Sequence, residues 1–372
     1  MSESIRVALA ITELSVGGAE TCLTNLAEGL DRSCFEAEVY SLGPPPRGPR
    51  GALVHRLHRA HVPVHFLGAR HAAHLPFAVS RLRRQLQRQR PHILQTFLFH
   101  ANVVGALAAR RRDVGHVVAG LRVAEQPTWR WWLQGRLRHR FDRVVCVSQA
   151  VASLAQRRGG WPAASLVVIP NGVDLNILAP AVPARREDYG LAPHRRLLLY
   201  AGRLDVQKGV DWLLEAATRF LPRLPAHDLL IAGDGPLRAT LGELASRAPL
   251  AGRVHFAPWQ PDVAPLLCAA DAVLLPSRWE GMSHLLLEAM ACARPVLATN
   301  VEGVAEVLGD LAGRQVVPRD DTASWTARLI ELVSDEEQGR QLGQLNQQRV
   351  GLHFSLAQMV SSYARLYTTL GD

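Results

Sequence analysis

Short apolar runs alternate with amphipathic stretches along the first 170 residues of the chain. The runs have the length of strands, and the stretches between them repeat apolar positions every three or four residues, as helices do. Strands that alternate with helices predict a parallel sheet covered by helices on both faces. The expected strands of this region are 5–11, 36–41, 62–66, 92–95, 116–119, 143–147 and 166–169.

A second series of the same kind begins after a stretch rich in Pro, Ala and Arg at 179–186, which has the composition of a linker. Its expected strands are 197–200 and segments near 228–232, 253–256, 272–275, 295–298 and 314–317. The final stretches, 320–350 and 355–370, look helical and have no strand between them. We therefore expect an α/β protein of two Rossmann-like domains, 1–178 and 179–352, that face each other across a hinge, with a C-terminal helix in 353–372 that packs back on the first domain.

Bulk composition narrows the class of protein. At 372 residues and 48% hydrophobic composition the chain can bury more than one core. No run of about 18 apolar residues lacks a charge, and no export signal is visible, so we expect a cytoplasmic protein without a transmembrane helix. The five cysteines lie far apart and are interpreted as small buried apolar residues in a reducing compartment.

The formal net charge is +9, the pI is near 10, and the excess is almost wholly arginine. Such a balance favours anionic partners, which include phosphates, anionic lipid headgroups and nucleic acid.

The loop after the first expected strand contains paired glycines, Gly17 and Gly18, before an apolar-periodic stretch. Paired glycines let backbone N–H groups at a helix start approach an anion closely. An ordinary strand-to-helix turn explains the same two residues, so both interpretations stay open. The loop is not a G-x-G-x-x-G fingerprint, and it therefore does not indicate a nicotinamide or flavin dinucleotide.

Two cations follow the expected strand 197–200. Arg203 lies in the loop, and Lys208 lies at the start of the next helix, where the helix dipole disfavours a cation by about 0.3–1 kcal/mol. A diphosphate between Arg203, Lys208 and exposed backbone N–H groups would offset that cost, because Arg offers a planar fork and Lys a mobile point charge. Two solvated loop cations are the alternative.

Two carboxylates, Glu280 and Glu288, follow the expected strand 272–275. Glu280 lies in the strand-to-helix loop and Glu288 just over one turn inside the helix, so both can face the crevice at the carboxyl end of the sheet. There they can accept hydrogen bonds from sugar hydroxyls, while N–H groups of 281–284 meet phosphate. Stabilisation of the helix dipole explains Glu288 alone but not Glu280, which Gly281 follows.

Six short motifs follow one another along nearly the whole chain: Gly17-Gly18-Ala19-Glu20, Ile169-Pro170-Asn171-Gly172-Val173-Asp174, Gly202-Arg203-Leu204 with Lys208-Gly209, Gly233-Asp234-Gly235-Pro236, Pro276-Ser277 with Glu280-Gly281, and Leu287-Glu288-Ala289-Met290-Ala291. In this order they resemble glycosyltransferase family four, a group of retaining enzymes with the GT-B fold. Each motif is weak alone, and the specificity comes from their shared order and spacing.

The resemblance implies a role for each matching residue. Arg203 and Lys208 match the pair that binds the donor diphosphate, Glu288 the carboxylate on the ribose, and Glu280 the one beside the transferred sugar. His100 falls where the family has a histidine that reaches the sugar from the N-terminal domain; a structural role is the alternative for any one of 15 histidines. The other expected donor contacts are Gly17, Gly18, Gly281, Met282, Ser283 and His284, with Pro258 and Trp259 near the base.

The resemblance further implies a retaining hexosyltransferase of polysaccharide biosynthesis. It would move a hexose or N-acetylhexosamine from a nucleotide diphosphate sugar, UDP before GDP, to a glycan, lipid-linked or small-molecule acceptor. We expect no cofactor and no metal, since the chain has no D-x-D sequence. Many relatives carry a small or apolar run where this chain has Met282-Ser283-His284, which leaves the donor sugar open.

Two other classes of function remain as alternatives. A sugar-nucleotide epimerase of the same fold would consume donor without an acceptor. A basic nucleic-acid-binding protein would use the positive charge, but aromatic residues are not interleaved with the basic ones beyond one tryptophan cluster, so no nucleic acid is expected.

Two arginine-rich stretches suit an acceptor or a membrane. In 79–90 a core stripe leaves the arginines outside, and in 129–141 apolar residues at every fourth position leave Trp131 and the arginines largely outward. A basic face with an exposed Trp suits peripheral contact with an anionic inner-membrane face, and a solvated basic face is the alternative. The residues assigned to this surface are Arg81, Arg84, Arg88, Trp131, Arg136 and Arg140.

Overall fold

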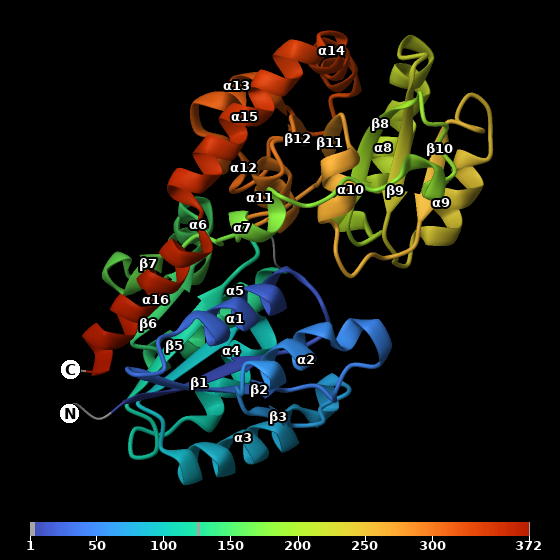
Figure 1. The fold of residues 1–372 in the computed structure, drawn as a ribbon. Helices are drawn as coiled ribbons and strands as arrows, with labels where there is room; N and C mark the ends of the chain where they lie inside the picture. Colours follow the sequence, from blue (N-terminus) through green and yellow to red (C-terminus); the bar gives the residue numbers. More distant parts are fainter. Residues whose placement is uncertain (1–3, 125–126, 372) are drawn as a thin grey trace. The chain divides into compact units, whose positions relative to one another are not determined.

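The computed structural model describes residues 4–124 and 127–371, and the chain divides into two compact units (Figure 1). Unit 1 comprises Met1–Gly172 and Leu356–Asp372, and unit 2 comprises Val173–Ser355. Each unit has its own parallel sheet and its own hydrophobic core.

The sheet of unit 1 has seven strands in the order β3-β2-β1-β4-β5-β6-β7. Their neighbours pair in parallel, and the expected strands are confirmed to within two residues at each end. β1 lies between β2 and β4 and is buried along most of its length, because helices cover both faces. The strands are β1 (Ile5–Ile11), β2 (Phe35–Ser41), β3 (Val64–Phe66), β4 (Ile93–Phe97), β5 (His116–Leu121), β6 (Arg143–Cys146) and β7 (Leu166–Val168).

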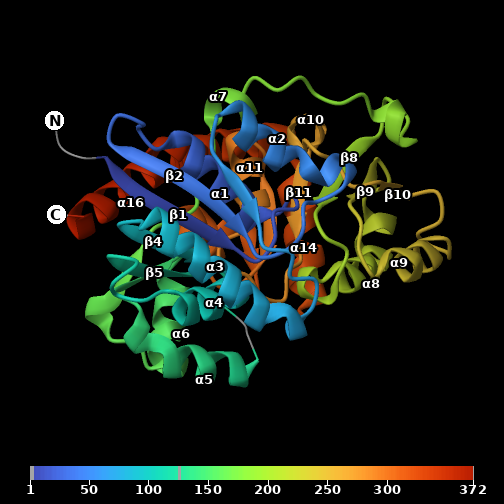
Figure 2. The ribbon, with the colours of Figure 1, turned by 90° about the horizontal axis from the view of Figure 1, so that it is seen from below.

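The helices of unit 1 form two rows. In one row α1 (Gly18–Gly29) contacts both α2 (Ala52–Arg59) and α16 (Leu356–Gly371). The other row, side by side in Figure 2, is α3 (Leu75–Gln89), α4 (Phe99–Ala108), α5 (Thr128–Leu137) and α6 (Gln149–Gly159). Right-handed crossovers place the two rows on opposite faces of the sheet, because the connections run in opposite directions away from β1.

Helix α16 belongs to the core of unit 1, although it follows unit 2 in the sequence (Figure 1). Its Met359, Tyr363 and Tyr367 are buried against α1, β1 and β4. The hydroxyl of Tyr367 donates a hydrogen bond to Oε1 of Gln95 at 3.4 Å. The chain therefore passes between the units twice, after Gly172 and after Ser355.

The prediction for Trp131 is wrong. Its side chain is 1% exposed in α5 and packs near Gly159, whereas the neighbouring Trp129 and Trp132 are 54% and 59% exposed. An α-helix has about 3.6 residues per turn, so positions four apart drift around it by about 40° at each step. The buried face instead contains Trp131 and Gln134, and Gln134 accepts a hydrogen bond from Asn102.

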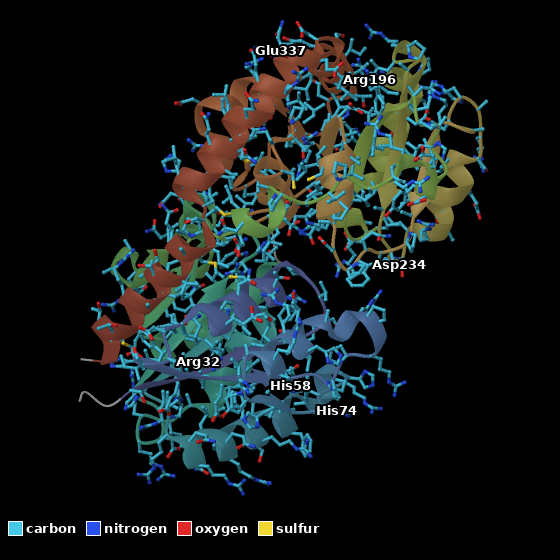
Figure 3. All side chains as sticks on the ribbon, viewed as in Figure 1. Arg32, His58, His74, Arg196, Asp234 and Glu337 are labelled. Carbon is cyan, nitrogen blue, oxygen red and sulfur yellow. The ribbon has the colours of Figure 1, made fainter. Side chains whose placement is uncertain are left out.

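The sheet of unit 2 has six parallel strands in the order β10-β9-β8-β11-β12-β13. Figure 3 labels Arg196, at the start of β8, and Asp234, just after β9, at opposite ends of this sheet. Asp234 thus marks the carboxyl edge, where an open α/β sheet binds its ligands. The strands are β8 (Arg196–Ala201), β9 (His227–Ala232), β10 (Val254–Ala257), β11 (Ala272–Leu275), β12 (Val296–Thr299) and β13 (Val316–Val317).

Unit 2 differs from expectation at one helix and at one strand. The helical stretch expected at 320–350 breaks at Asp335, whose side chain accepts a hydrogen bond from the backbone N–H of Gln338 and so starts a new helix. The last strand is shorter than expected because 312–315 form a helical turn. The helices are α7 (Leu175–Leu178), α8 (Val210–Phe220), α9 (Arg238–Ala245), α10 (Ala264–Ala269), α11 (His284–Ala291), α12 (Val304–Leu308), α13 (Ala312–Gln315), α14 (Thr322–Ser334) and α15 (Glu336–His353).

In the part of the chain that the structure describes, none of the helices combines the length and the apolar character that crossing a bilayer requires.

Candidate active site

The loops at the carboxyl edge of the unit 2 sheet pack backbone against backbone. Gly233, which follows β9, has φ +151°, and a Cβ added there would lie 1.9 Å from the carbonyl oxygen of Gly202. Gly209 has φ +64°, and its added Cβ would lie 2.0 Å from the carbonyl oxygen of Pro276. A side chain at either position would collide with backbone, so glycine sets the spacing of the loops after β8, β9 and β11.

Lys208 and Glu280 form an ion pair between two of these loops. Oε1 of Glu280 accepts a hydrogen bond from Nζ of Lys208 at 2.6 Å and from the hydroxyl of Ser277 at 2.7 Å. The Glu280 side chain is 8% exposed and that of Lys208 is 26% exposed. A carboxylate this buried needs such partners, because burial without them costs several kcal/mol. Lys208 is also the only lysine in the sequence.

Arg203 lies on the same loop as Lys208, but its side chain is 70% exposed. It forms an ion pair with Asp205, whose carboxylate also accepts a hydrogen bond from the backbone N–H of Lys208 at 3.2 Å. Asp205 thereby caps the short 3-10 turn Val206–Lys208 and holds both cations on one loop. Sequence reasoning missed Asp205, although an Asp three residues before Lys208 has the spacing of an N-cap.

The loop that carries Glu280 is tied to the loop that carries Lys208 at several other points. The backbone N–H of Arg278 donates to the carbonyl of Gln207 at 2.8 Å, and the side chain of Gln207 donates to the carbonyl of Trp279 at 3.2 Å. The guanidinium of Arg278 also forms an ion pair with Asp211 at 2.7 Å. The position of Glu280 is therefore fixed from both sides before any ligand arrives.

Helix α11 begins at the turn that follows Glu280. The hydroxyl of Ser283 caps it by accepting a hydrogen bond from the backbone N–H of Leu286, and Met282 and Ser283 are buried. His284 is half-buried as the first helical residue. These residues occupy the strand-to-helix turn expected from the sequence.

Glu288 lies in the second turn of α11 in surroundings unlike those of Glu280. Burial, and secondarily the negative charge of Asp262, raise the pKa of Glu288 to about 7. Asp262 belongs to the loop after β10 that also contains Pro258 and Trp259, so this loop comes close to Glu288. The two carboxylates thus differ in what acts on them: the buried Glu280 is ion-paired, whereas desolvation raises the pKa of the half-buried Glu288. No motif or spacing pointed to Asp262.

The site residues expected in the N-terminal half lie in unit 1. Gly17 is the N-cap of α1, in an extended conformation, and an added Cβ would lie 2.5 Å from the carboxylate of Glu20. His100 is the second residue of α4, and its ring contacts Phe99 edge to face. Burial and the positive charge of Arg130 lower the pKa of His100, so its neutral form is favoured at neutral pH.

The arginines of the expected basic surface are exposed. Arg81, Arg84 and Arg88 lie on α3; Arg136 and Arg140 lie at the end of α5 and just after it. The guanidinium of Arg136 lies 5.0 Å from the ring centre of the exposed Trp132. The aromatic component of this surface is therefore Trp129 and Trp132 in place of Trp131.

No three His, Cys, Asp or Glu side chains among residues 4–124 and 127–371 are grouped as they would be around a metal ion.

Comparisons with known proteins decide the family. The model "Glycosyltransferase Family 4" matches residues 16–177, and "Glycosyl transferases group 1" matches residues 195–335. The chain belongs to glycosyltransferase family four. Among relatives of this family-four glycosyltransferase, alpha-maltose-1-phosphate synthase of Mycolicibacterium smegmatis is 27% identical, covering 94% of this chain and 95% of that protein. N-acetyl-alpha-D-glucosaminyl L-malate synthase of Bacillus anthracis is 31% identical, over 49% of this chain and 48% of that protein.

Solved structures confirm the GT-B fold of this family-four chain. HepE of Anabaena, solved in complex with UDP-glucose, superposes with a TM-score of 0.85 at 21% identity, over 98% of this chain and 100% of that one. Sucrose-phosphate synthase of Thermosynechococcus elongatus superposes with a TM-score of 0.83 at 20% identity, over 98% of this chain and 99% of that one.

Proposed function

We propose that this family-four glycosyltransferase is a retaining hexosyltransferase that uses a nucleotide diphosphate sugar, with UDP as the favoured nucleotide, and needs no metal ion. The observation that carries the proposal is the Lys208–Glu280 pair at the carboxyl edge of unit 2. It places a cation for a phosphate and a carboxylate for sugar hydroxyls side by side, on loops that are already ordered. Family membership and the relatives' names support the class of reaction.

Each residue has a proposed role. Arg203 and Lys208 bind the diphosphate, Glu288 holds the ribose hydroxyls, and Glu280 and His100 contact the transferred sugar. Backbone N–H groups of Gly17, Gly18 and the α11 turn, Gly281, Met282, Ser283 and His284, complete the phosphate contacts. Pro258 and Trp259 lie on the loop proposed for the base, which agrees with the closeness of that loop's Asp262 to Glu288.

The proposed reaction retains the anomeric configuration. The oxygen of the acceptor hydroxyl forms a bond to the anomeric carbon on the face from which the nucleotide diphosphate leaves. The bond between that carbon and the phosphate oxygen breaks, and the departing phosphate oxygen takes the proton of the acceptor hydroxyl. Arg203 and Lys208 stabilise the negative charge that develops on the leaving group, where preorganised donors are worth the most.

UDP is favoured for the donor because HepE, which has the same fold, was solved with UDP-glucose. The proposed acceptor is a glycan, a lipid-linked saccharide or a small molecule. No cofactor and no nucleic acid enter the proposal.

Because Lys208 is the only lysine, amine chemistry can test this assignment directly. The protein is acylated with an amine-reactive ester in the presence of saturating UDP-glucose, GDP-mannose or ADP-glucose, and the modified peptides are quantified by mass spectrometry. We expect UDP-glucose to slow acylation of Lys208 while the α-amino group, an internal control, reacts at an unchanged rate. Binding itself is read from the melting temperature, because a ligand at 100 times its Kd stabilises the folded protein by about 2.7 kcal/mol. A nucleotide sugar that raises the melting temperature without protecting Lys208 would contradict the proposed diphosphate site.

The products separate transfer from the alternatives. Retention predicts that an α-linked donor gives an α-linked product, read from the anomeric proton by NMR. An epimerase would convert the donor sugar with no acceptor present. Salt-sensitive binding to arbitrary DNA, without nucleotide-sugar binding, would favour a nucleic-acid-binding protein.

We also propose that the protein works in the cytoplasm and that the α3–α5 face of unit 1 contacts an anionic inner-membrane surface. Exposed arginines beside exposed tryptophans support this, because anionic headgroups attract the first and the interface accommodates the second.

A further inference from the structure

Two cysteines that are distant in the sequence lie together in unit 2. Cys268 belongs to α10, and Cys292 is the C-cap of α11. Their sulfur atoms lie 3.9 and 3.6 Å from the same carbonyl oxygen, that of Leu178, to which both thiols donate. Both are free thiols; Cys292 is buried and Cys268 is half-buried. Their spacing in the sequence predicts two separate apolar side chains, whereas the fold makes them a dithiol.

The dithiol adjoins the helix that carries Glu288. The backbone N–H of Cys292 donates to the carbonyl of Glu288 at 3.0 Å, so the two residues share the last turn of α11. The negative charge of Glu288 is also one of the causes that raise the pKa of the Cys292 thiol. A change in the position of Cys292 therefore acts on the end of the helix from which Glu288 projects.

We propose that Cys268 and Cys292 are a redox-modification site, at which a peroxide converts the dithiol to a disulfide and thereby weakens donor binding. The effect on the donor rests on the function proposed above, whereas disulfide formation does not. The pair differs from the other cysteines: Cys34 is exposed on unit 1, and the thiol of Cys22 contacts the sulfur of Met359.

The chemistry balances with one peroxide per dithiol. The sulfur of Cys268, the more accessible of the two, attacks a peroxide oxygen; the O–O bond breaks, and a sulfenic acid and water form. The sulfur of Cys292 then attacks the sulfur of Cys268; the S–S bond forms, the S–O bond breaks, and the hydroxide leaves with the thiol proton as a second water. Two electrons pass from the thiols to the peroxide.

Geometry links this oxidation to the donor site. A disulfide holds its two sulfur atoms about 2.0 Å apart at a defined dihedral angle, so the oxidised pair ties α10 to the end of α11 in a geometry different from that of the two free thiols. The carbonyl of Leu178 loses both thiol contacts at the same time. Displacement of a binding group by about 1 Å can cost up to about 100-fold. We expect oxidation to weaken UDP binding about tenfold.

The experiment uses the full chain with Cys34→Ser, which removes the exposed thiol. The protein is treated with hydrogen peroxide, the remaining thiols are alkylated, and peptides are mapped by mass spectrometry. Calorimetry measures UDP affinity in the reduced, oxidised and re-reduced protein. We expect a 268–292 disulfide, seen as the loss of two hydrogen atoms from the linked peptides, and weaker UDP binding. Dithiothreitol should restore both the free thiols and the UDP affinity. Cys268→Ser, outside the donor contacts, should bind UDP normally and be insensitive to peroxide.

Three outcomes would overturn the proposal. Cys268 and Cys292 could remain fully alkylatable after treatment, the disulfide could form with unchanged UDP affinity, or Cys268→Ser could lose affinity on oxidation as the parent does. If the reduced protein binds no nucleotide sugar, the proposed function fails, and the effect on the donor fails with it. The peptide map decides disulfide formation separately in that case.

Discussion

The two units have the same kind of parallel sheet, but their charges are opposite. Unit 1 contains 24 Lys and Arg against 11 Asp and Glu, a formal net charge of +13, whereas unit 2 contains 18 against 22, a net charge of −4. The two cations proposed for the donor diphosphate nevertheless lie in the acidic unit. Under this proposal local geometry, and not the net charge of a unit, determines where the small anionic ligand binds.

The pairing of the cations explains this difference. Each proposed diphosphate ligand of unit 2 already has a carboxylate partner, Asp205 for Arg203 and Glu280 for Lys208, so each is held in place without raising the charge of the unit. In unit 1 the excess positive charge is spread over exposed arginines, such as Arg84 and Arg88. Dispersed charge of this kind suits an extended anionic surface, because each arginine there adds a small attraction.

The largest effect is expected where the loops of unit 2 meet. Gly209→Ala places a Cβ against the carbonyl of Pro276 and forces a left-handed conformation on alanine. We expect a loss of about 3–5 kcal/mol of stability in unit 2, from strain and overpacking together. Hydrogen exchange, read separately for each unit, measures it.

The matched control is Gly242→Ala in α9, where an added Cβ meets nothing within 4 Å. Alanine there should stabilise the helix by about 0.5–1 kcal/mol. Equal effects of the two substitutions would mean that the close approach at Gly209 does not hold the loops.

The next largest effect is expected from the loss of a cation that is paired with a carboxylate. Lys208→Gln removes the charge proposed to face the leaving phosphate, so kcat should fall by about 10²–10³, or 2.7–4 kcal/mol. Arg84→Gln on unit 1 should leave kcat with a water-soluble acceptor unchanged. Steady-state kinetics of both variants test whether catalysis depends on the paired cation or on total positive charge; a similar fall for both would favour the second.

The two carboxylates of unit 2 can be separated by pH. The folded pKa of Glu288, about 7, is above its ordinary value of 4.5, so the wild type should lose stability as pH rises between these values. Glu288→Gln removes this loss and should be more stable than wild type at pH 8 by up to about 3 kcal/mol, and about equal at pH 4. Urea denaturation at both pH values measures the difference, and equal stability at pH 8 would contradict the desolvation of Glu288.

The same variant should bind its donor less well. A hydrogen bond to a charged group is worth about 1.5–3 kcal/mol, so Glu288→Gln should raise the KM for the donor about 10- to 150-fold. Glu280→Gln should instead lower kcat while bare UDP still binds normally. Calorimetry with UDP beside kinetics with UDP-sugar measures both, and the opposite pattern would reverse the two roles.

The smallest effect per residue is expected on the surface of unit 1. Replacing Arg84, Arg88, Arg136 and Arg140 by Ser should weaken binding to anionic vesicles by about 1 kcal/mol for each arginine that lies near the surface. Co-sedimentation with phosphatidylserine vesicles at low and high salt measures it, and replacement of Trp129 and Trp132 should weaken it further. Equal sedimentation of the parent and the four-arginine variant would remove the membrane proposal.

Local pattern was enough to predict the strands but not every helix face. A buried parallel strand such as β1 is a continuous apolar run, which the sequence displays directly. A helix face depends on where the period begins. Close to Trp131 lie two further tryptophans, Trp129 and Trp132, so the apolar pattern has no unique phase. The partners of that face, Gly159 and Asn102, come from other segments of the chain.

The candidate site shows the same division. Motifs located Lys208 and Glu280 on their loops, but 72 residues separate them, and only the fold brings the amine to the carboxylate. The effect of Asp262 on Glu288 and the meeting of Cys268 with Cys292 likewise depend on how loops and helix ends pack. No local propensity encodes such meetings.

The position of α16 has a consequence for synthesis on the ribosome. Nascent domains usually fold in the order in which they are made. Unit 1 is begun first, yet Tyr363 and Tyr367 of its core are translated only after the whole of unit 2. Unit 2, which is one continuous segment, can complete its core earlier. The sheet of unit 1 therefore stays partly uncovered until α16 is translated, nearly two hundred residues later. During this interval the nascent chain most needs protection from aggregation.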